Sequence, residues 1–407
     1  MDIQLAWRNL WRNPRRTAVI LIAVVIGVWS MVFLAALMRG IVDGMIQNGI
    51  QTLTGHVQLH HSGYVQDPSV NHRIQHITET QKLVAEALPA HSHASNRVRV
   101  NAVISNAHHN GGVTLVGINP PDEARVSFIG TSVTQGSYLQ PDDTNAIVIG
   151  RALAQRFETG LGRKLILMSQ GTNGEIASYA FRIKGIFRAE MEATEKAYVF
   201  VPLHTAQKML GMTDAVSEIA IILPAYDQAE AVAQQLRDGL QGRSIKVRTW
   251  REALPLLVSY LDLYDSFILI WFVVVFVAMG FGIVNTTLMA VFERMREFGL
   301  LKALGMRPRR IVRGILTESF FILTCGIALG DLLGLVSCWT VSIKGIDLSA
   351  LAQGVEYAGM SRIIFPVLQI GDLINANGVV LGLGLLVSCY PAIKAARFTP
   401  VAAMRQN

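Results

Sequence analysis

The sequence has little charge and almost no cysteine. Only 16% of its 407 residues are charged, 51% are hydrophobic, and the three cysteines, Cys325, Cys338 and Cys389, all lie in long apolar runs. An ordinary soluble enzyme has about 25% charged residues, so the composition disfavours that class. Because residues 39–265 contain no cysteine, that segment must be stabilised by a hydrophobic core and not by disulfides.

The sequence also lacks the common catalytic motifs. It has no Gly-x-x-x-x-Gly-Lys-Ser/Thr phosphate-binding loop, no Gly-x-Ser-x-Gly and no His-Glu-x-x-His. The segment Gly171-Thr-Asn-Gly174 lacks the lysine that a phosphate-binding loop requires. We therefore predict no catalytic residue, no metal and no cofactor in this chain.

Four apolar runs reach about 20 residues, the length that spans a bilayer. The first is too long for the apolar region of a signal peptide, which favours a retained anchor. The resulting fold class is a membrane protein with four transmembrane helices and a large α+β extracytoplasmic domain between helices 1 and 2. The predicted parts are an amphipathic helix at 1–16, spans at 17–38, 266–292, 311–340 and 373–396, the extracytoplasmic domain at 39–265, a cytoplasmic helix at 293–310, an extracytoplasmic loop at 341–372 and a cytoplasmic tail at 397–407.

Basic residues near the span ends lie on one side of this topology. They are Arg8, Arg12, Arg15, Arg16, Arg294, Arg296, Lys302, Arg307, Arg309, Arg310, Arg313, Lys394, Arg397 and Arg405. The positive-inside rule therefore predicts cytoplasmic N and C termini. Residues 2–13 carry Trp7 and Trp11 on an apolar helical face, which indicates contact with membrane lipids. The pI near 9.4 then reflects the inner leaflet, and no nucleic-acid partner is expected.

The 39–265 segment alternates strand-like and helical patterns, typical of an α+β domain. A strand is predicted at 52–60, and helices at 79–88, 150–158, 202–210 and 226–240. Nine of the ten histidines lie between His56 and His109. A metal site there is an open alternative, but the spacings are scattered and no cysteine accompanies them. A solvated or pH-responsive surface is the favoured interpretation.

The 293–310 segment is a short basic helix between two spans. Phe298, Leu301 and Leu304–Gly305 have near-helical spacing and predict an apolar patch, with the charge of Glu297 beside it. Such a patch favours docking in the groove of a soluble partner; lying on lipid headgroups is the alternative. The candidate contact residues are Glu293, Arg296, Glu297, Phe298, Gly299, Leu301, Lys302, Leu304 and Gly305.

Polar and small residues also interrupt the spans. Intramembrane polar groups are costly and are often functional, although packing inside a helix bundle also explains them. The candidates are Asn285, Glu318 and Asp331. Gly326, Gly330 and Gly334 recur every four residues and predict close packing of helices or of subunits.

Several motifs carry a family resemblance. Glu293–Gly305 closely matches the coupling-helix pattern of FtsX/MacB-type ABC permeases (the type VII ABC fold), which include the Lol lipoprotein-releasing permeases. Trp7–Arg16 is similar to the N-terminal elbow of that family, and Asn145–Ala154 to a strand–helix start in its external domain. Pro391–Arg405 resembles its C-terminal segment.

The resemblance implies a function through partners. It implies a separate cytoplasmic ATPase that binds ATP and Mg²⁺, a second permease in a homodimer or heterodimer, and a bacterial inner-membrane location. Closure of the ATPases would push the coupling helices and shift the external domains.

The resemblance also bears on the cargo, the molecule that the permease would transport. The loop around 345–350 and 361–366 resembles Lol-type permeases, which favours lipoprotein release, with a periplasmic lipoprotein carrier as a further partner. Three alternatives stay open: MacB-like efflux of small molecules or peptides, FtsX-like control of a cell-wall hydrolase, and a histidine-based metal exporter or sensor.

Overall fold

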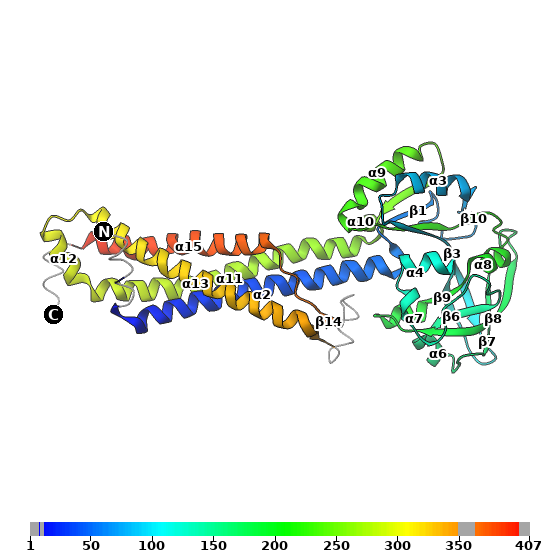
Figure 1. Ribbon diagram of the computed structural model, residues 1–407, viewed down its shortest axis with the longest axis horizontal. Coiled ribbons are helices and arrows are strands. Elements are labelled where there is room, and N and C mark those ends of the chain that lie inside the picture. Colours follow the sequence, from blue (N-terminus) through cyan, green and yellow to red (C-terminus); the bar gives the residue numbers. More distant parts are fainter. Residues whose placement is uncertain (1–7, 9–11, 349–362, 399–407) are drawn as a thin grey trace. The chain divides into compact units, whose positions relative to one another are not determined.

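The computed structural model describes residues 8, 12–348 and 363–398 (Figure 1). Among these the chain forms two compact units. The membrane unit takes the residues up to Asp43, Tyr260–Asp347 and those from Ile363 onward, and the sheet unit takes Gly44–Ser259. The predicted helix at 1–16 and the tail at 397–407 lie largely outside the described residues, as does the middle of the predicted loop at 341–372, residues 349–362.

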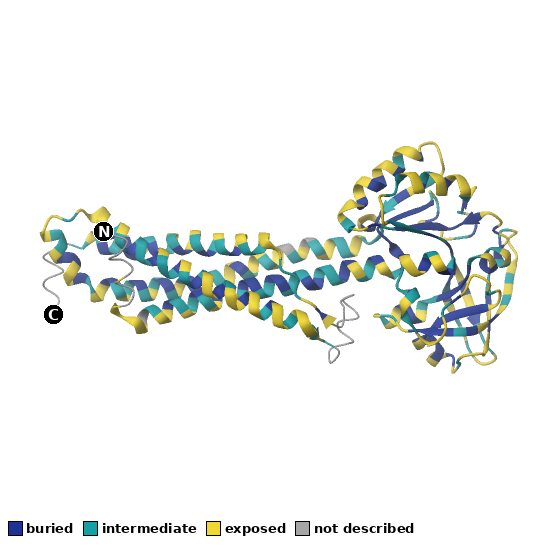
Figure 2. Ribbon diagram, viewed as in Figure 1, coloured by how far each residue is buried: buried dark blue, intermediate teal, exposed yellow. Residues whose placement is uncertain are grey.

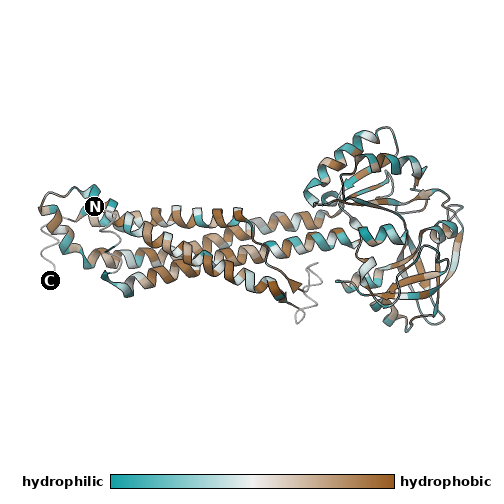
Figure 3. Cartoon of the chain, in the orientation of Figure 1, coloured by the Kyte–Doolittle hydropathy of each residue, from teal (hydrophilic) through white to brown (hydrophobic). Residues whose placement is uncertain are grey.

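Within the described residues, four helices are long and apolar enough to cross a membrane: α2 (Pro14–Gly49), α11 (Pro255–Glu293), α13 (Pro308–Lys344) and α15 (Ile370–Arg397). Hydrophobic residues are concentrated along them (Figure 3). Each helix contains one predicted span and continues past it, because backbone hydrogen bonding does not end where the apolar run ends. Between α11 and α13 lies the short helix α12 (Met295–Ala303). Strands β13 (Ile346–Asp347) and β14 (Ile363–Ile364) pair after α13.

The membrane unit has an apolar core with a few polar ties between helices. Val24, Val28, Met279, Leu323 and Val380 are among its buried members. Two of these polar ties join α2 to α15 and to α13. Arg39 donates two hydrogen bonds to Asp372, at 2.7 and 2.8 Å, and Trp29 donates to the hydroxyl of Ser337 at 3.0 Å.

The sheet unit is built on one mixed sheet, in the order β12-β1-β11-β3-β4-β9-β6-β8-β5, with β7 paired to β3 and β8. Its strands are β1 (Val57–His61), β3 (His93–Ser105), β4 (Asn110–Ile118), β5 (Val133–Gly136), β6 (Ala146–Gly150), β7 (Lys164–Gln170), β8 (Ile176–Phe187), β9 (Tyr198–Pro202), β11 (Glu218–Ile222) and β12 (Ile245–Thr249). Strands β2 (Ile74–Gln75) and β10 (Ala215–Val216) form a separate pair. Strands β1, β6, β9 and β11 are mostly buried (Figure 2).

Helices pack beside these strands and confirm the α+β character. They are α3 (Ile77–Ala87), α4 (Pro120–Val126), α5 (Ile129–Ser132), α6 (Arg151–Arg156), α7 (Glu192–Ala197), α8 (Leu203–Leu210), α9 (Ala229–Gly239), α10 (Trp250–Ala253) and the 3₁₀ turn η2 (Tyr226–Gln228). The four predicted helices correspond to α3, α6, α8 and α9. The predicted fold class is therefore confirmed.

The expected strand at 52–60 is shorter than predicted. Residues Ile50–Thr54 form the π-helical turn η1, and extended structure begins only at Val57. The backbone reverses at Leu53 and Gly55, whose φ angles are 66° and 69°. A positive φ is strained for leucine, so the surrounding contacts must hold this turn.

The two membrane helices α2 and α11 are connected through the chain to neighbouring strands of the sheet. Strand β1, which follows α2 and η1, pairs with β12, which precedes α10 and α11, and Val57 is opposite Thr249. The backbone N–H of Trp250 donates to the carbonyl of His56 at 2.9 Å. A Cβ atom on Gly49 would lie 2.8 Å from Leu254, so the helix ends are in close contact within this unit.

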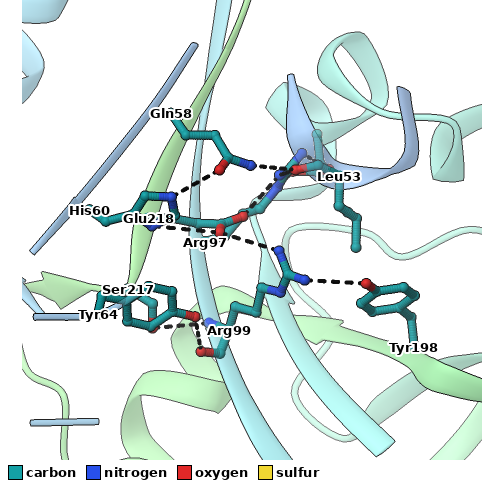
Figure 4. Close-up of polar contacts among 10 residues, drawn as sticks. Leu53, Gln58, His60, Tyr64, Arg97, Arg99, Tyr198, Ser217 and Glu218 are labelled. Atoms are coloured by element: carbon teal, nitrogen blue, oxygen red, sulfur yellow. Dashed lines mark hydrogen bonds and ion pairs between the residues drawn. The ribbon is translucent and has the colours of Figure 1, made fainter. Parts of the chain in front are cut away.

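A buried ionic cluster holds the strained turn (Figure 4). The guanidinium of Arg97 donates two hydrogen bonds to Glu123, at 2.9 and 2.7 Å, and one to Glu218, at 3.0 Å. It also donates to the carbonyl of Leu53. All three charged side chains are 0% exposed. Burial alone would raise the pKa of Glu218, but Arg99 and Arg97 hold that pKa below its ordinary value.

We expect Arg97→Met to destabilise the sheet unit by about 3–5 kcal/mol, because the buried carboxylate of Glu123 loses its counter-ion and that of Glu218 keeps only Arg99. The unfolding midpoint should fall by on the order of 10 °C, measured by thermal unfolding of the detergent-purified protein. Lys196→Met, which removes an exposed ion pair to Glu192, should change the midpoint little. Equal midpoints for the two variants would contradict the assigned role of Arg97.

The histidines of the 56–109 region are dispersed over this unit. His56 is buried in the sheet, and its Nδ1 accepts a hydrogen bond from the N–H of Leu223 at 2.8 Å. The rings of His61 and His72 stack at 5.3 Å. Within the described residues, no group of three or more His, Cys, Asp or Glu side chains could hold a metal ion.

Burial lowers the pKa of His56 to about 4, so His56 is neutral in the folded protein at neutral pH. The unfolded chain takes up a proton below about pH 6.5. This contribution to stability is therefore complete above pH 6.5 and is lost as the pH falls toward 4, by about 3 kcal/mol at most. His56→Asn keeps an acceptor for Leu223 and should flatten the pH dependence of the unfolding midpoint across this window. Parallel curves for variant and wild type would show that His56 does not cause it.

Candidate functional site

Helix α12 is the candidate site, because it is a separate short helix between two membrane spans. It begins after Arg294 and ends before Leu304. Gly305 has a φ of 91°, a conformation that glycine adopts readily and that commonly ends a helix. Pro308 then occupies the first turn of α13, a position suited to proline. These residues separate α12 from the spans and fix its length.

One face of α12 packs into the helix bundle. Phe298 is 7% exposed and Leu301 packs beside it. The apolar cluster around them also includes Val291, Ile311, Ile315, Ala392 and Ala395. The sequence pattern predicts Phe298 and Leu301 in an exposed patch, whereas the structure turns both toward the bundle. The reason is that α11, α13 and α15 supply an apolar surface that a helical pattern alone does not reveal.

The opposite face of α12 is open. Leu300 is 57% exposed and Leu304 76% exposed, and Arg296 is exposed on the same face. The spacing of four residues aligns the three side chains. Large exposed apolar side chains beside charged ones are typical of an interaction surface. Leu300 was not among the predicted residues, although its position four residues before Leu304 indicates the same face.

Polar contacts fix the orientation of α12. Arg294 donates to both carboxylate oxygens of Glu318 on α13, at 2.9 and 3.2 Å. Glu297 accepts from Arg294 at 3.3 Å and from Arg12 at 2.6 Å. The ammonium of Lys302 donates to the carbonyls of Ala396 and Phe398, at 2.7 and 2.6 Å. Lys302 thus caps the end of α15, and α12 is tied to two spans and to Arg12.

The remaining predicted residues of this region are placed as follows. Gly299 is buried, whereas Glu293 and Gly305 are exposed. The structure therefore does not gather all nine predicted contact residues on one surface. It places Arg296 and Leu304 on the open face and uses Phe298, Leu301 and Lys302 for internal contacts.

The predicted intramembrane polar residues have three different surroundings. Glu318 is the partner of Arg294. Asp331 on α13 accepts a hydrogen bond from the side-chain amide of Asn377 on α15 at 2.8 Å. Asn285 lies on an exposed face of α11. Two of the three thus join elements within the bundle.

The three predicted glycines pack α13 against α2. A Cβ atom on Gly326, Gly330 or Gly334 would lie 2.5 Å from Val24, 2.7 Å from Val28 or 2.9 Å from Val32, respectively. All three distances are shorter than real Cβ contacts. The small-residue face thus lies between two helices of this chain.

We expect Gly330→Ala to destabilise the membrane unit by about 1–3 kcal/mol, because the added methyl group overlaps Val28, and Gly330→Leu to have a larger effect. Gly314→Ala, on the same helix with open space around it, is the matched control and should be neutral or slightly stabilising. Thermal unfolding in detergent would measure both. Equal stability of the Gly330 variants and wild type would show that this contact is unimportant.

The arrangement of a helix bundle, an interhelical α12 and an α+β sheet unit is that of a transport permease. Two family models match the chain: the MacB-like periplasmic core domain over residues 17–238 and the FtsX-like permease C-terminal domain over residues 268–400. The chain therefore belongs to the FtsX/MacB-type family of ABC transporter permeases. The resemblance found in the sequence is confirmed.

Curated relatives agree with this family. The chain is 21% identical to the lipoprotein-releasing system transmembrane protein LolC of Neisseria meningitidis, over 96% of this chain and 94% of that protein. It is 25% identical to LolC of Xylella fastidiosa, over 80% of this chain and 81% of that protein. It is also 23% identical to the pyoverdine export ATP-binding/permease protein PvdT of Pseudomonas fluorescens, over 99% of this chain but only 59% of that protein.

Proposed function

We propose that this chain couples ATP hydrolysis by a separate cytoplasmic ATPase to movement of its sheet unit, and that this movement releases lipoproteins from the inner membrane. The observation that carries the proposal is the division of α12 into two faces. Its inner face is fixed by Phe298 and Lys302, while Leu300 and Leu304 are exposed. A helix held in this way can be pushed as one body with the spans around it.

The contacts of α12 support a mechanical role. Force applied to its outer face would reach α13 through the Arg294–Glu318 ion pair and α15 through Lys302. Helices α2 and α11 continue without a break into residues that belong to the sheet unit. There, the β1–β12 pairing joins their ends. Movement of the two helices would therefore be delivered to adjacent strands of one sheet.

The proposal also implies several partners. With no phosphate-binding loop in the sequence, the ATP and Mg²⁺ would be bound by the ATPase. The basic residues around α12 support a cytoplasmic position for this helix and for both termini. A second permease, identical or different, would complete the assembly, and a periplasmic carrier would accept the cargo.

Release of lipoproteins is favoured over transport of other cargoes. The LolC relatives match this chain over most of their own length, as a permease of the same construction would. The match to PvdT supports export of a small molecule as the competing function. A test must therefore measure cargo and not only ATPase binding.

The docking surface is tested by Leu300→Asp and Leu304→Asp. A charge placed in an apolar contact should remove co-purification of the ATPase, a loss typical of interface hot spots, while the permease inserts and melts as wild type. Ile176→Asp makes the same change at another exposed apolar residue, in the sheet unit, and should keep the ATPase bound. Phe298→Ala should instead lower the melting temperature, because it opens a cavity among buried side chains. Full ATPase binding by both aspartate variants would contradict the assignment.

The cargo is tested in proteoliposomes that contain the permease, its second permease and the ATPase. A lipidated protein should leave the membrane for a soluble carrier when ATP is added, and Leu304→Asp should abolish that release. If the lipidated protein stays in the membrane while a small molecule such as pyoverdine is exported, the lipoprotein assignment is wrong and the efflux alternative holds.

A further inference from the structure

A groove lies between α13 and α15 in the membrane unit. It has a volume of about 480 Å³. Leu316 and Phe320 line it from α13, and Gly382 and Leu386 from α15. Leu386 is 66% exposed, so the apolar wall opens outward from the bundle.

One end of this groove is basic. Arg309 and Arg313 line it at the start of α13, next to α12. They are four residues apart and therefore share one face of the helix. Both are exposed, and within the described part of the chain no ion pair neutralises either of them. The groove thus combines an apolar channel with two free positive charges at a single end.

Gly382 makes the hollow possible. A Cβ atom at this position would have no heavy atom within 4 Å, in contrast to Gly384 two residues later, where a Cβ atom would lie 2.8 Å from Leu323. Gly384 therefore serves helix packing, whereas Gly382 leaves open space. A larger side chain at 382 would occupy that space without disturbing the bundle.

We propose that this groove binds an anionic phospholipid, with an acyl chain between α13 and α15 and the headgroup phosphate at Arg309 and Arg313. Residues 309–320 extend over about 16 Å of helix, a length that suits an acyl chain in one leaflet. Basic pockets at the ends of membrane helices favour anionic headgroups. A water-soluble phosphate compound would leave the apolar part unfilled, so a lipid is the occupant that matches both ends.

The lipid would act as a structural part of the bundle near α12. It would bridge α13 and α15, the two helices that Arg294–Glu318 and Lys302 also tie to α12. Because the basic end adjoins α12, the lipid comes from the leaflet on that side. This separates the site from any lipid-anchored cargo, which would be taken from the opposite leaflet.

Native mass spectrometry of the full-length permease in detergent tests the proposal, with dioleoyl phosphatidylglycerol as probe and dioleoyl phosphatidylcholine as the neutral comparison. Wild type should retain more phosphatidylglycerol than phosphatidylcholine. Arg309→Gln and Arg313→Gln should each weaken its binding about five-fold, from the usual contribution of one basic side chain near anionic lipid. Arg310→Gln removes a neighbouring exposed charge that does not line the groove, and should bind as wild type.

Filling the groove gives an independent test that leaves the charges in place. Gly382→Leu should reduce phosphatidylglycerol binding at least as much as the arginine variants, with an unchanged melting temperature without lipid. Gly378→Leu is the matched control, since Gly378 is equally open but lies outside the groove.

Three outcomes would overturn the proposal. Equal binding by wild type, Gly382→Leu and the arginine variants would show that the lipid binds elsewhere. Equal retention of phosphatidylcholine would show an unselective apolar surface. Competition by glycerol phosphate, with no effect of Gly382→Leu, would show a phosphate site that does not use the acyl chain.

Discussion

Arg97 ties distant parts of the sheet unit together, because three buried groups that need polar partners all bind it. Two are the carboxylates of Glu123 and Glu218, and the third is the carbonyl of Leu53. A buried ion pair adds little net stability, but a buried charge without its partner is very costly. The cluster therefore allows one arrangement of strands β3 and β11, helix α4 and turn η1. That arrangement holds Leu53 at its positive φ, directly after the first membrane helix.

Helix α12 likewise depends on contacts with other segments of the chain. Helix α12 has only nine residues, too few for stability in isolation. Its order comes from Phe298 in an apolar cluster and from Arg294, Glu297 and Lys302 in ion pairs or carbonyl contacts. Because these contacts use one face only, Leu300 and Leu304 stay exposed. The residues that make α12 rigid and those available to a partner are therefore different residues.

The sequence predicts those features that depend on residues close together in the chain. Apolar runs predicted the four spans, and the 293–305 motif placed α12 between them. The spacing of Gly326, Gly330 and Gly334 indicated close packing but not the partner, which is α2. Arg97 and Glu218 are 121 positions apart, so no local pattern predicts their contact. The direction in which Phe298 points could not be predicted either, since it depends on the surface that α13 and α15 present.

Helix α13 shows how one span can serve three neighbours without conflict. Its glycines admit α2 so closely that no side chain fits at Gly330. Another face meets α15 through Asp331 and Asn377 and, nearer α12, leaves the groove at Gly382. In its first turns, Glu318 binds Arg294, while no ion pair among the described residues neutralises Arg309 or Arg313. An ion pair that faces the bundle fixes α12, whereas charges that face outward cannot stabilise the bundle by themselves. Their position beside an open apolar channel is the reason to assign them to a ligand from the membrane and not to the fold.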